Sequence, residues 1–207
     1  MLTQLENDNV KDIYEQIAPQ FNNTRQYRWS WVNEFLNTLE DNSIVLDLGC
    51  GNGRNMNSKR VNFIGLDNCA NLLEICEKKG LNVIEGDVCE LPFDNSSCDA
   101  IINIAVFHHL STPERRLKSL QEMSRVCRKG GNILLSVWSK TQPKKTRRTF
   151  DVYGDTIVKW NQNGEIFERY YYIFQIDEIK QLFKDAGLSI ISHDYDCGNE
   201  VFVLTPE

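Results

Sequence analysis

The stretch that decides the fold is Ile44-Val45-Leu46-Asp47-Leu48-Gly49-Cys50-Gly51-Asn52-Gly53-Arg54. It opens with a short, mostly apolar run, which is typical of a strand that is buried on both faces of a parallel sheet. Glycines then stand at every second position. Glycine there lets the backbone turn tightly and approach a ligand that a Cβ atom would keep at a distance. The stretch therefore predicts a buried strand that ends in a ligand-binding turn.

A second predicted strand carries an acidic residue at its end. Phe63-Ile64-Gly65-Leu66 is a further apolar run, and Asp67 follows it about twenty residues after Asp47. In nucleotide-binding sheets an acid at this place accepts hydrogen bonds from the ribose hydroxyls of the ligand. The glycine turn and the acid together predict a nucleoside ligand.

The details of the turn narrow the ligand further. The spacing Gly-x-Gly-x-Gly differs from the Gly-x-Gly-x-x-Gly pattern that brings a helix N-terminus to a pyrophosphate. Asp47 lies just before the first glycine, where a carboxylate suits a cationic amino-acid group better than a phosphate. We therefore expect an adenosine with a cationic amino-acid tail, which is S-adenosylmethionine. The alternative is a plain strand-to-helix turn that binds no ligand.

The rest of the chain alternates strands with helices. The expected strands run over residues 44–48, 63–66, 82–85, 98–105, 132–138, 188–193 and 200–204. The expected helices run from Val10 to Pro19, from the cap residue Ser30 to Leu39, from Leu72 to Lys79, from the cap residue Thr112 to Cys127, and from Ile176 to Gly187. This order predicts an α/β fold with a doubly wound, mostly parallel seven-stranded sheet and one antiparallel strand. We expect one domain over residues 1–207, with an N-terminal helical cap at 1–40 and a substrate-side insertion at 139–175.

The predicted binding site lies at the carboxyl ends of the strands, near the first strand, because ligands of doubly wound sheets bind there. The glycine turn, Asp67, Asp87 and His108 all fall on this edge. The cofactor-binding residues expected there are Asp47, Leu48, Gly49, Gly51, Asp67, Asn68, Asp87, Val88 and Ile104.

Composition limits the other possibilities. The chain has 207 residues, a formal net charge of −6 and seven cysteines, none in a Cys-x-x-Cys pair. We expect neither a membrane span nor a signal peptide, because no apolar run is long enough and the N-terminus is polar. The protein is therefore expected to be cytoplasmic, or also nuclear, with reduced thiols and no metal ion. The basic run from Lys140 to Arg148 is either a solvated loop or a contact for an RNA backbone.

Several motifs beyond the glycine turn are specific to fewer protein families. They are Tyr14-Glu15-Gln16-Ile17-Ala18, Thr24-Arg25 with Trp29, Ile104-Ala105-Val106-Phe107-His108-His109-Leu110-Ser111-Thr112, Glu114-Arg115-Arg116, Val158-Lys159-Trp160, Arg169-Tyr170-Tyr171 and Gly198-Asn199. With them the chain resembles, almost from end to end, the eukaryotic tRNA wobble-uridine methyltransferases, which have the Rossmann-like class I methyltransferase fold. Lys129 and Lys159 stand where members of this family usually carry proline.

The resemblance implies an activity, a cofactor and two partners. This family transfers a methyl group from S-adenosylmethionine to the carboxylate of 5-carboxymethyluridine in the tRNA anticodon loop, which gives the methyl ester. Its members work as heterodimers with a small zinc-binding activator subunit. Two other functions stay open. One is methylation of a small molecule, such as a carboxylate, and the other is a catalytically silent module that binds partners.

The implied nucleophile is a carboxylate, whose ordinary pKa of about 4 leaves it ionised at neutral pH. No general base is then needed, and the protein has to align the carboxylate with the methyl group in a dry pocket. Arginine suits this task because its planar fork fixes a carboxylate in one orientation. The expected clamp residues are Arg25, Arg148 and Arg169, with His108 on the substrate side of the catalytic centre.

Other side chains are expected around the substrate. Trp29 and Trp160 are expected to stack on the base, with core packing as an equal alternative. His109 is expected to hydrogen-bond a neighbouring loop beside the substrate. Arg147 and Tyr170 complete the expected substrate-binding residues, whereas Arg115 and Arg116 are expected to face solvent or a partner.

Overall fold

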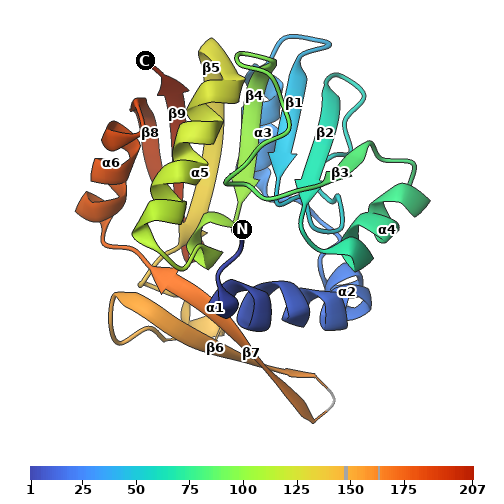
Figure 1. Cartoon of the computed structure of the whole chain (residues 1–207), viewed down its shortest axis with the longest axis vertical. Coiled ribbons are helices and arrows are strands. Elements are labelled where there is room, and N and C mark those ends of the chain that lie inside the picture. The colour runs from blue at the N-terminus through green and yellow to red at the C-terminus, as the bar shows by residue number, and fades with distance from the viewer. Residues whose placement is uncertain (147–148, 163) are drawn as a thin grey trace.

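Seven strands form the central sheet of this computed structural model, which describes residues 1–146, 149–162 and 164–207 (Figure 1). They pair in the order β3-β2-β1-β4-β5-β9-β8. The strands are β1 (Ile44–Leu48), β2 (Asn62–Asp67), β3 (Val83–Glu85), β4 (Cys98–Ile104), β5 (Cys127–Trp138), β8 (Leu188–Asp196) and β9 (Asn199–Pro206). Every pairing from β3 to β5 is parallel, whereas β9 runs antiparallel to β5 and to β8. The predicted doubly wound sheet with one antiparallel strand is confirmed.

The strand order reverses beside β1, which pairs with β2 on one side and with β4 on the other. A crevice forms outside the carboxyl ends of the strands at such a point, because the chain leaves the two neighbouring strands in opposite directions. The turns that follow β1, β2 and β4 therefore meet at one edge of the sheet, below the arrowheads of β1 and β2 in Figure 1.

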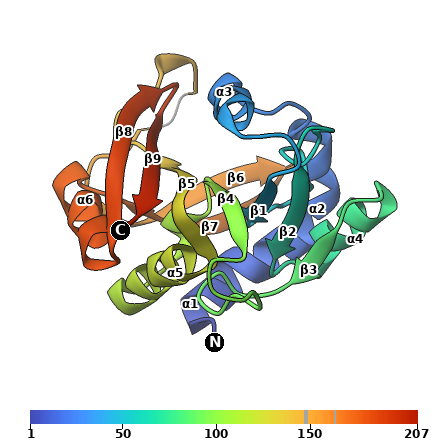
Figure 2. The same ribbon diagram turned by 90° about the horizontal axis from the view of Figure 1, so that it is seen from above.

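Helices cover both faces of the sheet (Figure 2). They are α3 (Ser30–Thr38), α4 (Ala70–Lys78), α5 (Pro113–Val126) and α6 (Ile176–Asp185). Val32 and Phe35 of α3 pack against Val45 of β1 on one face. Phe63 of β2 contacts this cluster and also the cluster under α4, so the two helices share that face. α5 and α6 cover the opposite face.

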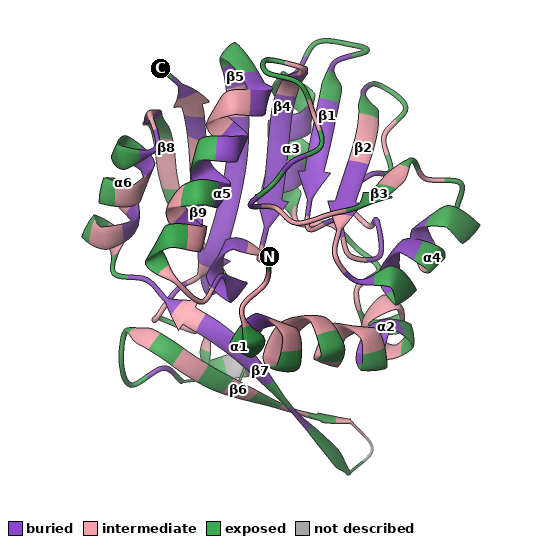
Figure 3. Ribbon diagram, viewed as in Figure 1, coloured by how far each residue is buried: buried purple, intermediate pink, exposed green. Residues whose placement is uncertain are grey.

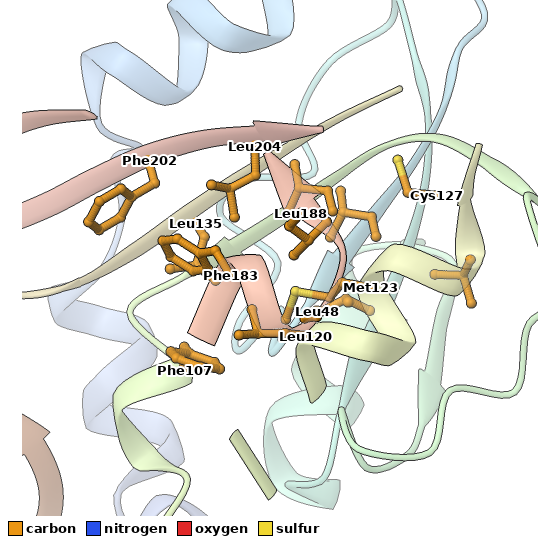
Figure 4. Close-up of a cluster of buried hydrophobic side chains, with 14 of the residues drawn as sticks. Leu48, Phe107, Leu120, Met123, Cys127, Leu135, Phe183, Leu188, Phe202 and Leu204 are labelled. Carbon is orange, nitrogen blue, oxygen red and sulfur yellow. The ribbon is translucent and has the colours of Figure 1, made fainter. Parts of the chain in front are cut away.

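The larger core cluster lies between the sheet and the helices α5 and α6 (Figure 4). Leu48 and Leu135 from the strands meet Leu120 and Met123 of α5 and Phe183 of α6. The central strands are buried along most of their length, and the exposed residues gather on the outer sides of the helices (Figure 3). Burial of apolar surface on both faces is what stabilises a parallel sheet.

Three N-terminal helical segments run past the carboxyl edge of the sheet (Figure 1). They are α1 (Gln4–Glu6), the π-helix η1 (Asn7–Lys11) and α2 (Asp12–Thr24). The prediction that Pro19 ends this helix is wrong, because Pro19 lies inside α2. Proline has no N–H for the carbonyl of Glu15, and the side-chain amide of Asn71 donates to that carbonyl instead, at 2.9 Å.

An antiparallel hairpin of β6 (Gly154–Gln162) and β7 (Glu165–Ile173) extends beyond the N-terminal helices (Figure 1). The sequence predicts no strand here, although Val158 and Trp160 of β6 alternate with exposed neighbours, as in a strand with one covered face. Two boundaries also differ from the prediction. β5 already begins at Cys127, which pairs with Cys98 across a β-bulge, and the cap of α3 is Trp29, whose backbone is extended.

Glu15 caps α4 from the neighbouring helix. Its carboxylate oxygens accept the N–H of Ala70 at 2.6 Å and the N–H of Asn71 at 2.9 Å, while the N-cap residue Cys69 makes no side-chain cap bond. We expect Glu15→Ala to lower the free energy of unfolding by about 1 kcal/mol, the usual cost of a lost cap. Urea unfolding measures this difference, with Glu77→Ala on the exposed side of α4 as the control. Equal losses in both variants would contradict the cap.

Candidate active site

A cavity of about 760 Å³ opens between the carboxyl edge of the sheet and the N-terminal helices. Its wall includes the glycine turn after β1, Asp67 after β2, Asp87 after β3 and His108 after β4. Arg169 of β7 closes it on the hairpin side. The cavity therefore lies at the strand-order reversal where the sequence predicts the site.

The glycine turn is held against the end of β2. The N–H groups of Gly49 and Cys50 both donate to the carbonyl of Leu66, at 2.7 and 3.0 Å. Gly49 has a φ of +78°, and a Cβ atom on it would lie 2.3 Å from Cγ2 of Val106. Only glycine fits this position, because both the backbone conformation and the space exclude a side chain.

Asp67 is tied to the same turn. Its Oδ2 accepts the N–H of Gly51 at 2.7 Å, and its Oδ1 accepts the N–H of Cys69 at 3.0 Å. Burial raises the pKa of Asp67, while these backbone hydrogen bonds favour the ionised form. The carboxylate is thus fixed in orientation at the cavity wall, as an acceptor for a pair of hydroxyl groups should be.

Asp47 is completely buried behind the cavity wall. Among the described residues neither of its carboxylate oxygens has a hydrogen-bond partner. Burial and the negative charge of Asp67 raise its pKa to about 7, against the opposing positive charges of Arg54 and Arg28. Both arginines line the cavity. Asp47 does not itself line the cavity, so its charge can act on a ligand there only from behind the wall.

Asp87 is held by the first turn of α5. Nη2 of Arg115 donates to both of its oxygens, at 2.9 and 3.0 Å, and Oδ1 also accepts the N–H of Cys89 at 2.9 Å. Burial alone would raise the pKa of Asp87, but the hydrogen bonds from Arg115 and Cys89, together with the positive charges of Arg115 and the N-terminus, outweigh burial and lower the pKa. Asp87 is therefore a fixed anion at the cavity wall, where Asn68, Val88 and Ile104 also lie.

The two adjacent histidines belong to the 3-10 turn η2 (Phe107–His109) and both line the cavity. Nδ1 of His109 donates to the carbonyl of Tyr170 at 2.7 Å, so its Nε2 accepts the hydroxyl of Tyr14 at 3.3 Å. Burial lowers the pKa of His109 to about 3, which keeps the ring neutral. Nδ1 of His108 accepts the backbone N–H of Trp138 at 3.0 Å. Neither histidine is a free base.

Several arginines line the cavity, although the whole chain is acidic. Arg25, Arg28, Arg54 and Arg169 all line it. Arg169 is only 7% exposed, and its Nη1 donates to the hydroxyl of Tyr14 at 3.4 Å. Its Nε has no hydrogen-bond partner among the described residues. This part of the cavity therefore has a buried donor available for an anion.

Aromatic rings stand beside these arginines. Trp29 lines the cavity and stacks on Trp31, with 6.0 Å between ring centroids. Tyr171 lies parallel to Trp138 at 4.1 Å and close to His108 at 4.8 Å. Tyr171 is buried among these rings, whereas the partly exposed Trp29 can stack on a nucleobase that has been turned out of its own stack.

Several predicted site residues lie elsewhere. Leu48 does not line the cavity, because its side chain lies in the core and its carbonyl accepts the amide of Asn103. Tyr170 points away from the cavity toward Asp155, since neighbours on a strand alternate and Arg169 faces inward. Trp160 contacts Arg169 rather than the cavity. Arg147 and Arg148 lie outside the described residues.

The prediction for the arginine pair on α5 is also wrong. Arg115 and Arg116 have side chains only 11% and 3% exposed, because carboxylates, carbonyls and an aromatic ring enclose both guanidinium groups. They are internal residues of the site region rather than a solvent-facing surface.

Other cavity residues escaped the sequence prediction. Arg54 directly follows the glycine turn, and Arg28 stands in the aromatic stretch before Trp29, so both positions carried a signal. Tyr171 could be predicted only if β7 were identified as a strand. Side chains alternate between the two faces of a strand, so Tyr171 then lies on the same face as Arg169. Glu6 carried no signal, since its partners are distant in the sequence.

Two further findings concern metal ions and membranes. Within residues 1–146, 149–162 and 164–207, no three His, Cys, Asp or Glu side chains gather in a way that could hold a metal ion. In that same part of the chain, no helix has both the length and the apolar character needed to cross a bilayer.

Sequence comparison gives close relatives. Residues 46–135 match a family described as methyltransferase domain. A tRNA (carboxymethyluridine(34)-5-O)-methyltransferase of Schizosaccharomyces pombe is 35% identical over 222 residues, which cover 96% of this chain and 96% of the relative. A protein of the same name from Mus musculus is 39% identical over 161 residues, covering 77% of this chain but 24% of the relative. The chain thus spans about a quarter of the mouse relative's length.

Solved structures share the fold. A chain from the complex of the Haloferax volcanii Trm112 methyltransferase activator with a methyltransferase has a TM-score of 0.72 at 18% identity, covering 96% of this chain and 98% of that one. An S-adenosylmethionine-dependent methyltransferase from Clostridium acetobutylicum has a TM-score of 0.71 at 14% identity, covering 93% and 98%. The fold is that of the class I methyltransferases, and the matches imply S-adenosylmethionine as the cofactor.

Asp47→Asn tests the buried carboxylate. Its folded pKa of about 7 lies above the ordinary 3.8, so ionisation opposes folding and stability falls as the pH rises between these values. We expect the variant to be more stable near pH 8, by roughly 3 kcal/mol. We also expect it to bind S-adenosylmethionine about tenfold more weakly, because a favourable charge interaction is lost. Calorimetry and denaturant unfolding measure both effects.

The exposed Asp94→Asn is the matched control, since it removes the same charge from the surface. Lower stability together with unchanged cofactor affinity in Asp47→Asn would show that Asp47 serves packing alone.

Proposed function

This chain belongs to the family of tRNA (carboxymethyluridine(34)-5-O)-methyltransferases, and on that premise we propose that it methylates 5-carboxymethyluridine at the wobble position of tRNA. The acceptor is the side-chain carboxylate of the uridine, and the product is its methyl ester. The observation that carries the proposal is the fission-yeast relative, whose 35% identity extends over 96% of both chains. The match therefore extends over the segments that form the cavity and not only over the glycine turn.

The cofactor side of the cavity fits S-adenosylmethionine. When bound, this cofactor supplies a methyl group on a positively charged sulfur. Asp67 would accept hydrogen bonds from the two ribose hydroxyls, and Asp87 would face the adenine. Asp47, whose oxygens lack partners among the described residues, would balance the charge of the amino-acid end. The glycine turn leaves room for the ligand to approach the backbone.

The hairpin side of the cavity fits the nucleotide. Arg169 has a buried Nε donor for the carboxylate, and Arg25 stands on the opposite wall contributed by the N-terminal region. A planar guanidinium holds a carboxylate in one orientation, which an in-line attack on a methyl group requires. Trp29 offers a flat face for the base, and Tyr171 supports the wall behind it. Arg28 and Arg54 add positive charge for the RNA backbone.

The chemistry needs no general base. The acceptor carboxylate is already ionised at neutral pH, with an ordinary pKa of about 4. His109 could not take a proton in any case, because its pKa is about 3 and both of its ring nitrogens are hydrogen-bonded. The contribution of the chain is alignment of the reactants and exclusion of water, which otherwise stabilises the separated charges.

We assign two segments to the wall of the cavity on the substrate side. They are the N-terminal cap, residues 1–40, and the insertion, residues 139–175. Tyr14 of the cap and Arg169 of the insertion meet at 3.4 Å across the cavity edge. All seven cysteines, which lie in the described part of the chain, are free thiols, and we assign the enzyme to the reducing cytoplasm.

A small zinc-binding activator is the second proposed partner, and β3 suits it. β3 is an edge strand, so its outer backbone groups are available to another chain. Ile84 on it is an apolar side chain that is 37% exposed. The structurally similar archaeal chain comes from a complex with an activator.

Methyl transfer to tRNA tests the function. The chain, alone and with an activator, is given S-adenosylmethionine with a labelled methyl group and tRNA from cells that lack wobble-uridine methyltransferase. We expect label in the wobble nucleoside, released as methanol by mild alkali because it is held in an ester. Label that resists alkali, or that enters a small carboxylate but not tRNA, would contradict the proposal.

Arg169→Lys tests the clamp. The charge is kept but the planar fork is lost, so we expect kcat on tRNA to fall about a hundredfold. Cofactor affinity should stay unchanged, because Arg169 lies on the hairpin, away from the glycine turn, Asp67 and Asp87 of the cofactor side. Lys159→Arg on the exposed side of the hairpin is the control. A wild-type rate in Arg169→Lys would remove this residue from the clamp.

Ile84→Asp tests the activator surface. In the complex the activator would cover the new carboxylate, and desolvation of an unpaired carboxylate is costly. The variant should therefore no longer coelute with the activator in size-exclusion chromatography. Ile191→Asp provides the control, since Ile191 is 57% exposed on β8 at the opposite edge of the sheet. Loss of the complex in the control but not in Ile84→Asp would move the partner to the other edge.

A further inference from the structure

Two neighbouring arginines of α5 connect to different halves of the active site. We propose that Arg115 positions the cofactor half and that Arg116 positions the substrate half. The inference rests on the proposed function for the identity of the substrate. Both residues act through other groups, so they are positioning residues rather than catalytic ones.

The first turn of α5 fixes where the two side chains start. Oγ1 of Thr112 accepts the N–H of Arg115 at 3.3 Å, and the carbonyl of Thr112 accepts the N–H of Arg116 at 3.0 Å. Successive side chains on an α-helix point about 100° apart. The two guanidinium groups therefore leave the same turn in different directions.

Arg115 makes hydrogen bonds with both terminal nitrogens of its guanidinium group and an ion pair at the third nitrogen. Nη2 donates to both oxygens of Asp87, at 2.9 and 3.0 Å, and Nη1 donates to the carbonyl of Met1 at 2.9 Å. Nε forms an ion pair with Oε2 of Glu6 at 2.6 Å. A lysine ammonium could not span these three directions. Arg115 thus joins the acid after β3 to the N-terminal segment.

Glu6 extends this link to the segment that leads into α5. It is 2% exposed, and its Oε1 accepts the N–H of Ser111 at 2.6 Å and the hydroxyl of Ser111 at 3.0 Å. Leu2, Glu6, Val10 and Tyr14 all line the cavity and recur at every fourth residue. One side of the N-terminal helical segment therefore forms the cavity wall, and the contact between Glu6 and Arg115 holds it in place.

Arg116 faces the hairpin instead. Its Nε donates to the carbonyl of Leu110 at 2.9 Å, directly after the histidine turn. Its Nη2 donates to the hydroxyl of Tyr170 at 3.3 Å, and its Cζ lies 3.4 Å from the ring centroid of Tyr172. A guanidinium stacked on a ring and bonded at its edge fixes both partners.

The contacts of Arg116 set the direction of the residues that face the cavity. Side chains alternate along β7, so Tyr170 and Tyr172 lie on one face of the strand and Arg169 and Tyr171 on the other. By holding the tyrosine face, Arg116 orients Arg169 and Tyr171 toward the substrate.

Glutamine substitutions separate the two roles. For Arg115→Gln we expect the Kd of S-adenosylmethionine to rise about tenfold, because charged hydrogen bonds are lost, while the KM for tRNA at saturating cofactor is unchanged. For Arg116→Gln we expect about a tenfold rise in the KM for tRNA with unchanged cofactor Kd. Lysine at either position should not rescue the affected constant.

Less disruptive variants show whether a change in either constant comes from lost positioning or from an unfolded protein. Glu6→Gln should raise only the cofactor Kd, and Tyr170→Phe should raise only the KM for tRNA, since each removes one contact of one arginine. Lys118→Gln, exposed on the same helix, is the matched control. If both constants move together in all four variants, α5 is a general scaffold and the division of roles is wrong.

Two readouts do not depend on activity. Calorimetry measures cofactor binding without tRNA, and deuterium uptake over residues 165–173 reports whether β7 is still held in place. We expect Arg115→Gln to change only the cofactor affinity. We expect Arg116→Gln to change only the deuterium uptake of β7. A wild-type chain that fails to methylate tRNA would overturn the proposed function and leave these measurements valid. The reverse pattern in the two variants would overturn the inference.

Discussion

The close contact between Gly49 and Val106 is the constraint on which the site depends. A Cβ atom on Gly49 would lie 2.3 Å from a methyl carbon of Val106, so the turns after β1 and β4 interlock without space for a side chain. The first turn carries the cofactor site through Gly51 and Asp67. The second leads directly into His108 and His109. The contact therefore sets the distance between the two halves of the cavity, where methyl donor and acceptor have to meet.

Buried charges give this region its specificity at a cost in stability. Asp47 is buried without a close partner in the described structure, and ionisation of such a group opposes folding. Glu6, Arg115, Arg116 and Arg169 are also enclosed, but each has several partners. Buried ionic groups seldom add net stability, and they fix geometry instead. A cavity that must align an anion with a sulfonium cation needs such fixed geometry.

The sequence predicts most of the fold and the cofactor side, because these depend on local signals. The apolar runs, the glycine turn, Asp67 and Asp87 each occupy a fixed place relative to a strand end. The hairpin side was harder to predict, because it depends on contacts between distant segments. Tyr14 reaches His109 and Arg169, and Glu6 reaches Ser111 and Arg115, over separations of about a hundred residues or more. Without β7 as a strand, Tyr170 was assigned to the cavity in place of Tyr171.

Methyl transfer without a general base is the central chemical claim, and the pH dependence of single-turnover transfer to tRNA at saturating S-adenosylmethionine tests it most directly. The wild-type rate should stay flat from about pH 5.5 to 8.5, because the acceptor carboxylate and the arginines keep their charges throughout. Saturation with the cofactor keeps any titration of Asp47 out of the measured rate. A rate that rises with an apparent pKa near 6–7, and loses this rise in His108→Ala, would show that a histidine removes a proton and would contradict the carboxylate as the acceptor.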